Sequence, residues 1–355
     1  MKIHAVTSAL IMAAAIGVVQ TDAGAVGTQP VSSSSERHRC SPSVDIRAFS
    51  DELDKTTFDD VYAGNLSALA VDRDGRIATL SDESYLFSLA VREGAHTVGA
   101  KPIAVVPLRK QDGTAPDSEG LAVDKDGSYL ITSETEPSVA RYHRDGEAAA
   151  ELPVPTSLAV APVGRATRNQ TFEGLTLEPG ARTLIASMEG ALAGDDPEAV
   201  RLQSWYRDMV DRPFRTGAQY GYRVDEGLGV AEIASVGKDR LLVLERGYTP
   251  DYGNTIRLYL ADLHKAQNTS KVETLTIGGA TRLADKTLLA DLVNCPDLGA
   301  TAGQPQENPL LDNIEGLAVT GRTTGGGLRI LLVSDDNENA TQTTRMYVMD
   351  IRLPR

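Results

Sequence analysis

DSEGLAVDKDGSYLITSETE, residues 117–136, contains an apolar run, an Asp-Gly turn, a second apolar run and closing acids. The same order recurs in four other stretches: LSALAVDRDGRIATLSDE (66–83), FEGLTLEPGARTLIASME (172–189), VAEIASVGKDRLLVLERG (230–247) and NIEGLAVTGRTTGGGLRILLVSDDNEN (313–339). Asp-Gly and glycine-rich pairs between apolar runs favour β-hairpin turns, because such turns need a positive φ. The chain is therefore predicted to repeat a strand–turn–strand unit.

Units of this kind, at intervals of some 40 to 50 residues, are typical of propeller blades. About 310 residues follow an N-terminal arm, a length that suggests six blades. A sixth, weaker unit is placed at 272–292, and outer strands are placed at 102–108 and 256–262. The predicted fold is therefore an all-β, six-bladed β-propeller.

One stretch, 195–212, breaks the repeat. Its Asp-Asp-Pro-Glu start and the spacing of Val200, Trp205 and Met209 predict a short helical insertion on one face of the propeller. It would serve either as a lid over a site or as packing for the only tryptophan.

The N-terminus is predicted to be an export signal. Lys2 gives a positive start, 9–19 is apolar, and Ala23-Gly24-Ala25 resembles a cleavage site. We expect a signal peptide at 1–25, cleaved after Ala25, a disordered linker at 26–42 and the propeller domain at 43–355. The mature protein would be secreted, either extracellular or periplasmic. No other segment is long and apolar enough to span a bilayer.

Two cysteines, Cys40 and Cys295, remain in the mature chain. In an exported protein an even pair suggests a disulfide, which here would tie the N-terminal arm to a late segment and close the ring. The alternative is two unpaired thiols.

The formal net charge is −14. An acidic surface argues against nucleic acid as a partner, because such binding requires neutralisation of phosphates. It suits a cation site, although ordinary solvation explains much of the charge.

The repeat also places acids together. Each unit pairs an opening residue with a closing acid: Ser67 with Asp82, Glu119 with Glu134, Glu173 with Glu189, Glu232 with Glu245, and Glu315 with Asp335. A hairpin folded at its turn brings these two ends side by side, so we expect the acids to collect on one face. In the fourth unit Glu226-Gly227-Leu228 is another possible opening, but the count to the closing acid favours Glu232.

Several motifs resemble those of a known family. They are NLSALAVD…TLSDE, DSEGLAVDKDG…ITSETEP, RNQTFEGLTLEPG…ASMEGAL, LLVLERGY and NPLLDNIEGLAV…LLVSDDNENATQTT. Their order across nearly the whole mature chain resembles the phytase-like propeller family, described as "esterase-like activity of phytase", of secreted bacterial proteins. This resemblance implies a β-propeller fold and a phytase-like activity.

Common hydrolytic motifs are absent from the sequence. It has no G-x-S-x-G elbow, no H-E-x-x-H and no Cys/His zinc spacing. His96, His143 and His264 are interpreted as surface residues, so a nucleophilic triad is not expected.

The acids offer a different chemistry. Converging carboxylates repel one another unless they are protonated, hydrated or neutralised by a cation, and hard divalent cations take oxygen ligands. We predict a divalent cation site, Ca²⁺ in the first place and Mg²⁺ or Mn²⁺ as substitutes. The predicted ligands are Glu119, Glu173, Glu232, Glu315, Glu134 and Asp335, with further oxygens from Asp336, Asn337 and Asn339. The alternative is a structural role, in which these acids cap strands or pair with Arg246, Arg141 or Arg345.

The predicted catalytic residues are Glu173, Glu245 and Arg246. Arg246 would either bind a phosphate or carboxylate bidentately or pair with Glu173 or Glu189. The predicted function is a monomeric, metal-dependent hydrolase of small-molecule phosphoesters or carboxylic esters, with a lactonase as a close variant. The alternative is a binding or scaffold propeller without chemistry, holding at most a structural Ca²⁺.

Overall fold

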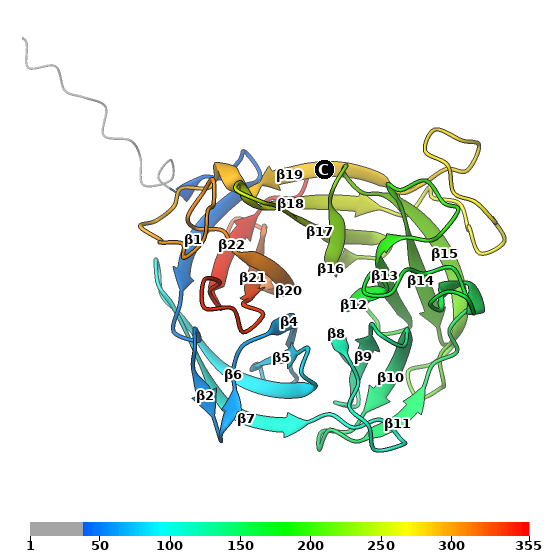
Figure 1. Ribbon diagram of the computed structural model, residues 1–355, viewed down its shortest axis with the longest axis horizontal. Coiled ribbons are helices and arrows are strands. Elements are labelled where there is room, and N and C mark those ends of the chain that lie inside the picture. Colours follow the sequence, from blue (N-terminus) through cyan, green and yellow to red (C-terminus); the bar gives the residue numbers. More distant parts are fainter. Residues whose placement is uncertain (1–37, 355) are drawn as a thin grey trace, which may run out of the picture.

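The computed structural model describes residues 38–354. The predicted signal peptide, 1–25, and residues 26–37 of the predicted linker lie outside the described residues. Within the described part, five four-stranded antiparallel sheets stand around a central axis, as Figure 1 shows. The all-β propeller predicted from the repeat is therefore confirmed.

Each sheet forms one blade, with its strands ordered outward from the axis. Blade one contains β4 (Leu66–Val71), β5 (Ile77–Ser81), β6 (Tyr85–Glu93) and β7 (Val98–Pro107). Blade two contains β8 (Ser118–Val123), β9 (Tyr129–Ser133), β10 (Ser138–Tyr142) and β11 (Ala148–Glu151). Blade three contains β12 (Phe172–Leu177), β13 (Thr183–Ala191), β14 (Ala199–Tyr206) and β15 (Arg215–Arg223). Blade four contains β16 (Gly229–Gly237), β17 (Arg240–Thr249), β18 (Gly253–Asp262) and β19 (Asp285–Asp291). Blade five contains β20 (Asn313–Arg322), β21 (Leu328–Asp335), β22 (Met346–Ile351) and β1 (Val44–Ser50).

Four short elements complete the described chain. β2 (Thr57–Phe58) and β3 (Val61–Tyr62) form a small hairpin before blade one. The helical pieces among the described residues are single 3₁₀ turns, η2 (Thr156–Leu158) and η3 (Leu292–Asn294). No helix within 38–354 has the length and apolar character needed to cross a membrane.

The ring has five blades, so the prediction of six was wrong. The expected sixth unit, 272–292, does not form an inner hairpin. Its last part is β19, which pairs with β18 as the outer strand of blade four. Its first part packs on blade three, where the Arg201 guanidinium donates to the carbonyl oxygen of Val272 at 3.1 Å. Each of the five repeat stretches supplies one inner hairpin, and their number sets the number of blades.

The helical insertion expected at 195–212 was also wrong, because β14 occupies this segment and pairs with β13 and β15. Trp205 is fully buried on β14, and its indole Nε1 donates to the carbonyl oxygen of Pro153 at 2.7 Å. Met209 is 52% exposed, so the helical spacing does not mark one buried face. Asp195 binds Arg201 Nε at 2.6 Å instead of capping a helix.

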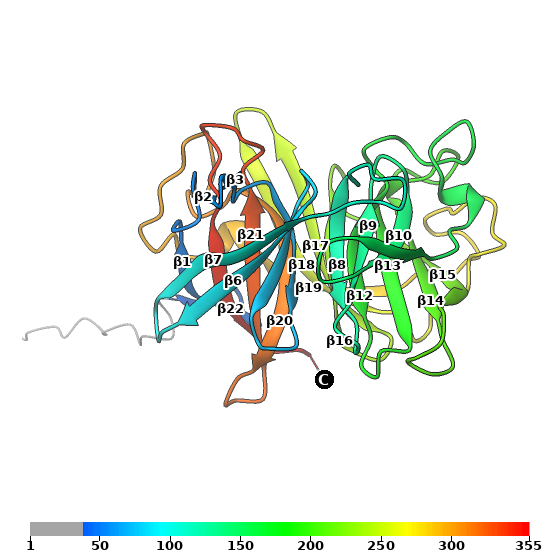
Figure 2. The ribbon, with the colours of Figure 1, turned by 90° about the horizontal axis from the view of Figure 1, so that it is seen from below.

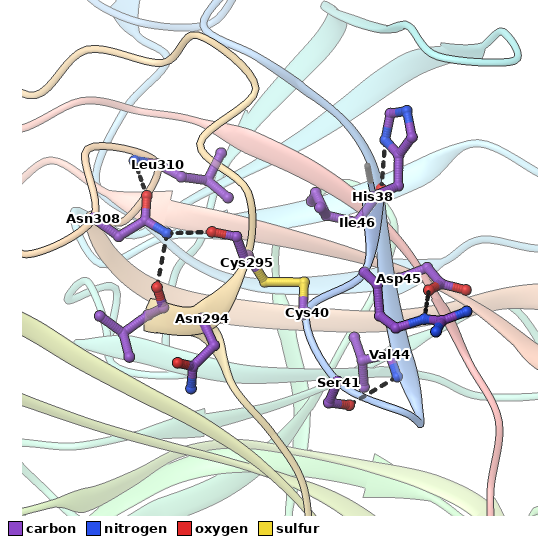
Figure 3. Close-up of a disulfide and its surroundings, with 12 residues drawn as sticks. His38, Cys40, Ser41, Val44, Asp45, Ile46, Asn294, Cys295, Asn308 and Leu310 are labelled. Carbon is purple, nitrogen blue, oxygen red and sulfur yellow. Dashed lines mark hydrogen bonds and ion pairs between the residues drawn. A yellow bond between two sulfur atoms is a disulfide. The ribbon is translucent and has the colours of Figure 1, made fainter. Parts of the chain in front are cut away.

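The N-terminal arm closes the ring. β1 pairs with β22 and so completes the blade built by the C-terminal strands. The predicted disulfide between Cys40 and Cys295 is present and joins the residues before β1 to the loop after η3 (Figure 3). The side-chain amide of Asn308 donates to the carbonyl oxygen of Cys295 at 2.7 Å and so fixes that loop.

The inner strands β4, β8, β12, β16 and β20 contact one another in sequence around the axis. Their close approach depends on the glycine of the Glu-Gly-Leu repeat. A Cβ atom on Gly120 would lie 2.2 Å from the carbonyl oxygen of Glu173, and one on Gly174 would lie 2.5 Å from the backbone nitrogen of Ile233. Both distances are too short for a side chain, so glycine is required for these neighbouring strands to approach so closely.

Carboxylates also clamp the blades together at the far ends of the inner strands, near the hairpin turns. Asp124, which follows β8, accepts two hydrogen bonds from the buried guanidinium of Arg207 in blade three, at 2.8 and 2.5 Å. Asp72, which follows β4, accepts hydrogen bonds from Arg144 and Tyr129 of blade two. These acids are therefore paired with groups of the next blade. Figure 2 shows the blades edge-on, with their strands running between the two faces.

Removing the disulfide is expected to lower the free energy of unfolding by about 2–4 kcal/mol, because the cross-link restricts the unfolded chain. The bonded residues are 255 positions apart. Urea unfolding of a Cys40→Ala, Cys295→Ala double variant, beside wild type with and without reductant, measures the effect. An unchanged unfolding midpoint in the double variant would contradict it.

Breaking the clamp of blades two and three is expected to be more damaging. Asp124→Asn leaves the buried Arg207 without its counter-charge, so the free energy of unfolding should fall by about 3–5 kcal/mol. Asp126→Asn is the matched control, because the side chain of Asp126 is 65% exposed and its pair with Arg141 contributes only about 0–1 kcal/mol. Equal losses in the two variants, measured by urea unfolding, would rule out the clamp.

Candidate functional site

Each inner strand carries a β-bulge at or next to the predicted opening position of the repeat. In β20 the pairing with β21 shifts by one residue between Ile314 and Gly316, which leaves Glu315 as the extra residue. Corresponding shifts occur in the other four inner strands, and in β16 the extra residue is Ala231, one place before Glu232. Because of the bulge, the closing acid Asp335 pairs with Asn313 and not with Glu315 itself. A bulge re-aims a side chain and is common beside functional sites.

The starts of the inner strands surround a hollow of about 430 Å³ at the channel mouth, which we call the acid pocket. Eight carboxylates line it: Asp82, Asp117, Glu119, Glu134, Glu173, Glu189, Glu315 and Asp335. The other lining residues are Arg246, Tyr248, Asn169, Asn254, Asn313, Asn337 and Gln342. Among the described residues, Arg246 is thus the one cation against eight acids.

Glu134, Glu173 and Glu189 form the tightest group in the acid pocket. One carboxylate oxygen from each lies within 4.8 Å of the others. The three side chains come from blades two and three, on β12, on β13 and just after β9. Two oxygens on opposite sides of one calcium ion are roughly 5 Å apart, since Ca–O distances are about 2.3–2.6 Å. The group is therefore compact enough to hold one divalent cation.

Arg246, on β17, links the acids of blades three and five. Its Nη2 atom lies 3.4 Å from a carboxylate oxygen of Glu189 and 3.3 Å from one of Glu315. Its Nη1 atom donates to the side-chain oxygen of Asn313 at 3.0 Å. The amide nitrogen of Asn313 donates to Glu315 at 2.9 Å and to Asp335 at 3.4 Å. The guanidinium is thus held in place by several partners at the edge of the pocket.

The acids of the pocket hold their protons more strongly than exposed acids do. Burial is the largest cause, and repulsion from neighbouring carboxylates adds to it. The pKa is raised to about 7 at Asp82, Glu134 and Glu315 and to about 8 at Asp335. Burial and like charge also raise the pKa values of Glu119 and Glu173 well above the usual range. A bound cation would relieve this repulsion and favour the ionised forms.

Asp82 gives a further indication that a cation belongs here. Its Oδ1 atom is buried and has no hydrogen-bond partner among residues 38–354. A buried carboxylate oxygen without a partner is costly, and a cation would supply that partner. The potential donors are carboxylate and amide oxygens, the ligands that hard ions such as Ca²⁺ and Mg²⁺ prefer. The residues therefore fit a divalent cation.

The structure does not bring Glu232 and Glu245 into the acid pocket. The choice of Glu232 as the opening residue of blade four was wrong, because the bulge of β16 leaves Ala231 as the extra residue and Glu232 pairs with Leu244. The Glu232 carboxylate accepts hydrogen bonds from the backbone nitrogens of Leu175 and Ile233 at 3.0 and 2.8 Å. It therefore joins β16 to β12. Glu245 is fully buried and accepts a hydrogen bond from Lys286 Nζ at 2.7 Å, so its charge is compensated within blade four.

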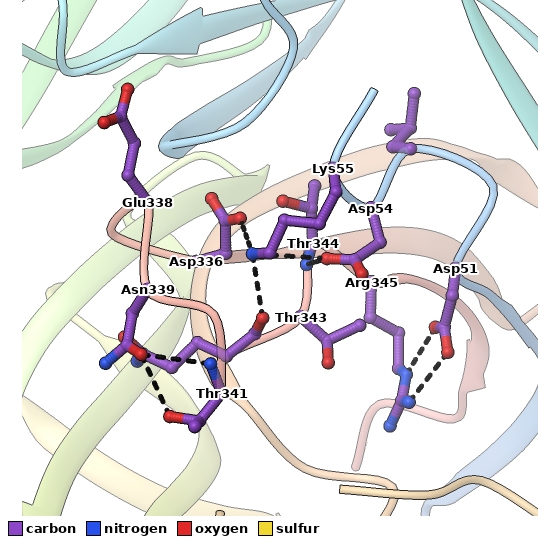
Figure 4. Close-up of polar contacts among 12 residues, drawn as sticks. Asp51, Asp54, Lys55, Asp336, Glu338, Asn339, Thr341, Thr343, Thr344 and Arg345 are labelled. Carbon is purple, nitrogen blue, oxygen red and sulfur yellow. Dashed lines mark hydrogen bonds and ion pairs between the residues drawn. The ribbon is translucent and has the colours of Figure 1, made fainter. Parts of the chain in front are cut away.

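The loop after β21 contributes less than the sequence suggests. Asp336 is fully buried and bonds to Lys55, as Figure 4 shows. Asn339 accepts hydrogen bonds from Thr341 within its own loop at 3.0 Å. Of the three oxygen-bearing residues expected from this loop, Asn337 lines the acid pocket.

In the alternative hypothesis, the acids have a structural role and pair with one of three arginines. Arg141 binds Asp124 at 2.6 Å, and Arg345 binds Asp51 at 2.6 Å (Figure 4). Arg246 lines the acid pocket itself, where it reaches two of the eight carboxylates. Ion pairs with Arg246 therefore account for two of the carboxylates in the pocket, and the other six have no arginine partner there.

Sequence reasoning missed Asp117, Asn313, Asn254 and Tyr248. A signal for two of them was present, because the residue two places before each opening position faces the closing acid. The backbone nitrogen of Glu134 donates to the carbonyl oxygen of Asp117 at 3.0 Å. Asn313 has the same place in blade five. For Asn254 and Tyr248, which face each other across β17 and β18, the repeat held no signal.

Comparison with known proteins identifies the family. The model of the phytase-like family, described as "Esterase-like activity of phytase", matches residues 61–338. No curated protein matches the sequence.

Among solved structures, the chain is similar to the PQQ-bound aldose sugar dehydrogenase of Streptomyces coelicolor, with 13% identity, a TM-score of 0.42 and coverage of 88% of this chain and 99% of that one. It is also similar to a Trichoderma reesei carbohydrate-active enzyme of family AA12, with 14% identity, a TM-score of 0.40 and coverage of 92% and 100%. Virginiamycin B lyase of Staphylococcus aureus has 9% identity, a TM-score of 0.36 and coverage of 82% and 83%. At these identities and TM-scores, the likeness says nothing about activity.

The raised pKa values predict how stability depends on pH. When a chelator keeps the protein free of metal, the protonated acids of the pocket stabilise the folded state. This contribution is complete below the usual carboxyl pKa of about 4 and is lost as pH rises through about 7–8. The melting temperature of the metal-free protein should therefore fall between pH 5 and pH 8. Because a cation binds the ionised acids, Ca²⁺ should raise the melting temperature more at pH 8 than at pH 5.

A Glu134→Gln, Glu189→Gln double variant is expected to show a smaller fall with pH and a smaller response to Ca²⁺. Glu232→Gln is the control, because Glu232 is a buried acid of an inner strand that lies outside the acid pocket. If both variants respond to Ca²⁺ as wild type does, the cation does not bind at this group.

Proposed function

Because the chain belongs to the phytase-like family, we propose that it is a metal-dependent hydrolase of phosphoesters or carboxylic esters. The observation that supports this most is the set of eight carboxylates around one guanidinium at the channel mouth. Buried charge of one sign is costly to maintain, so a purely structural ring would be expected to carry its own counter-ions. Such clusters of acids with shifted pKa values are typical of functional sites.

Glu134, Glu173 and Glu189 would hold the cation, with Glu119 beside them, and Ca²⁺ suits these oxygen ligands best. When bound, the ion would supply Lewis acidity toward an ester or phosphoryl oxygen and lower the pKa of water. The remaining roles fall to the residues on the other side of the pocket.

Arg246 would bind and orient the oxygen on which negative charge develops. A guanidinium suits this task because its planar donors match carboxylate and phosphate oxygens. Asn313 holds the guanidinium from one side at 3.0 Å. Its two carboxylate neighbours, Glu189 and Glu315, prevent it from swinging out of the pocket.

Glu315 would accept a proton from the attacking water. Its pKa is raised to about 7, which suits a general base near neutral pH, and it lies 3.3 Å from Arg246. Glu173, predicted as catalytic, belongs to the cation group. Glu245 is outside this scheme because Lys286 already neutralises it.

The cellular location of the protein is part of the same proposal. The disulfide fits an oxidising environment outside the cytosol, as the predicted signal peptide requires. We propose an exported, monomeric enzyme that acts on small molecules.

Turnover of p-nitrophenyl phosphate and p-nitrophenyl acetate, measured with and without chelator, tests the proposal. We expect chelator-sensitive hydrolysis of at least one of the two. Glu173→Gln and Glu315→Gln should each reduce kcat by about 100-fold or more, because each removes a charge needed for binding the cation or moving the proton.

Glu232→Gln should keep wild-type turnover, since Gln retains the oxygen that accepts the two backbone hydrogen bonds. Circular dichroism and melting temperature establish that each variant is folded. A folded wild-type protein that binds Ca²⁺ but hydrolyses no ester on a broad panel would favour a scaffold instead.

A further inference from the structure

A second hollow opens beside the acid pocket, between blades three and four. Its volume is about 650 Å³, within the range of small-molecule sites. We call it the groove, and its lining residues are Thr167, Gln170, 189–195, Pro197, 227–229 and 246–248. Glu189, Arg246 and Tyr248 line both hollows, so the groove leads directly into the acid pocket.

Backbone forms much of the groove wall. A Cβ atom on Gly247 would lie 2.6 Å from the carbonyl oxygen of Gly227, and one on Gly229 would lie 2.9 Å from the side chain of Glu189. Gly227 has a φ of +75° and no atom within 4 Å of a Cβ, so it faces open space. Side chains at these positions would fill the groove or push its walls apart.

The charge of the groove limits what can bind there. Across both hollows, Arg246 is the one cationic side chain within the described residues. Asp195 is already neutralised by Arg201 at 2.6 Å and by Arg165 at 3.4 Å. Apart from Glu189, Arg246 and Asp195, the groove therefore offers neutral contacts, from Thr167, Gln170, Leu192, Leu228 and the half-exposed ring of Tyr248.

We propose that the groove binds the uncharged body of the substrate while its single reacting ester group lies in the acid pocket. This inference rests on the proposed hydrolase function and names its substrate class: an ester with one reacting group and a neutral, partly apolar body. A polyphosphorylated substrate would bring several negative charges to a surface with one arginine and eight carboxylates. Like charge disfavours such a substrate, whereas a neutral body meets peptide groups and an aromatic ring.

Filling the groove tests this inference. Ala193 is exposed in the groove wall and its backbone nitrogen donates to Arg165, a bond that Ala193→Trp retains. For p-nitrophenyl hexanoate, Ala193→Trp should lower kcat/KM about tenfold, because the apolar body loses its contacts. For methyl acetate, followed by titration of released acid, kcat/KM should stay within about twofold, since this ester does not reach the groove.

Ala95→Trp is the matched control, because Ala95 is exposed in the turn between β6 and β7, in blade one. It should leave kcat/KM for both esters within about twofold of wild type. If Ala193→Trp has no effect on the hexanoate, or reduces turnover of both esters equally, the groove does not bind the substrate body. Faster hydrolysis of inositol hexakisphosphate than of the hexanoate would also overturn the proposal.

A binding measurement separates this inference from the proposed function. Hexanoyl-4-nitroanilide, an amide analogue of the long ester, should bind to wild type and to Ala95→Trp in calorimetry but at least about tenfold more weakly to Ala193→Trp. If no ester is turned over and this pattern still appears, the hydrolase proposal fails and the groove stands as a binding site. If esters are turned over and the anilide binds all three proteins equally, the groove proposal fails and the hydrolase stands.

Discussion

A buried carboxylate needs a cation or several donors nearby, and the inner strands of this propeller carry carboxylates at both of their ends. At the turn ends the requirement is met from within the protein, as when Asp124 binds the buried Arg207 of the next blade. At the starting ends it is not met, because eight acids share Arg246. The paired acids at the turn ends hold neighbouring blades together. The acids at the starting ends keep negative charge that is available to a cation.

Much of this arrangement can be predicted from the repeat, because the two strands of a hairpin are close together in the sequence. Turn residues and apolar runs located all five inner hairpins, and folding each hairpin at its turn placed Glu119 and Glu134 at the same end of blade two. Contacts between distant segments were not accessible in the same way. Lys286, from the segment taken for a sixth blade, neutralises Glu245, and the backbone of Leu175 captures Glu232. The apparent helix at 195–212 failed for a related reason, since β13 and β15 were available as partners for β14.

The bulges explain why acids that look equivalent in the sequence have different roles. Each bulge turns the opening residue away from the regular alternation of its strand, and the neighbouring inner strand then decides what this residue meets. In blade three the bulge places Glu173 beside Glu134 and Glu189. In blade four the bulged residue is Ala231, and Glu232, the next residue, accepts hydrogen bonds from two backbone donors. The groove beside blade four lies next to Arg246, where the acids give way to glycine backbone. Chemistry and recognition thus occupy adjoining sectors of one face.

The closure of the ring by β1 has a consequence for how the protein is made. β1 precedes all the other strands of the five blades in the sequence, yet its partner β22 follows all of them. Cys40 likewise forms its disulfide with a residue 255 positions later in the sequence, Cys295. β1 therefore has no strand edge to pair with until blade five has formed, and the ring stays open up to that point. Oxidation of the two thiols then links the N-terminal arm covalently to the closed ring.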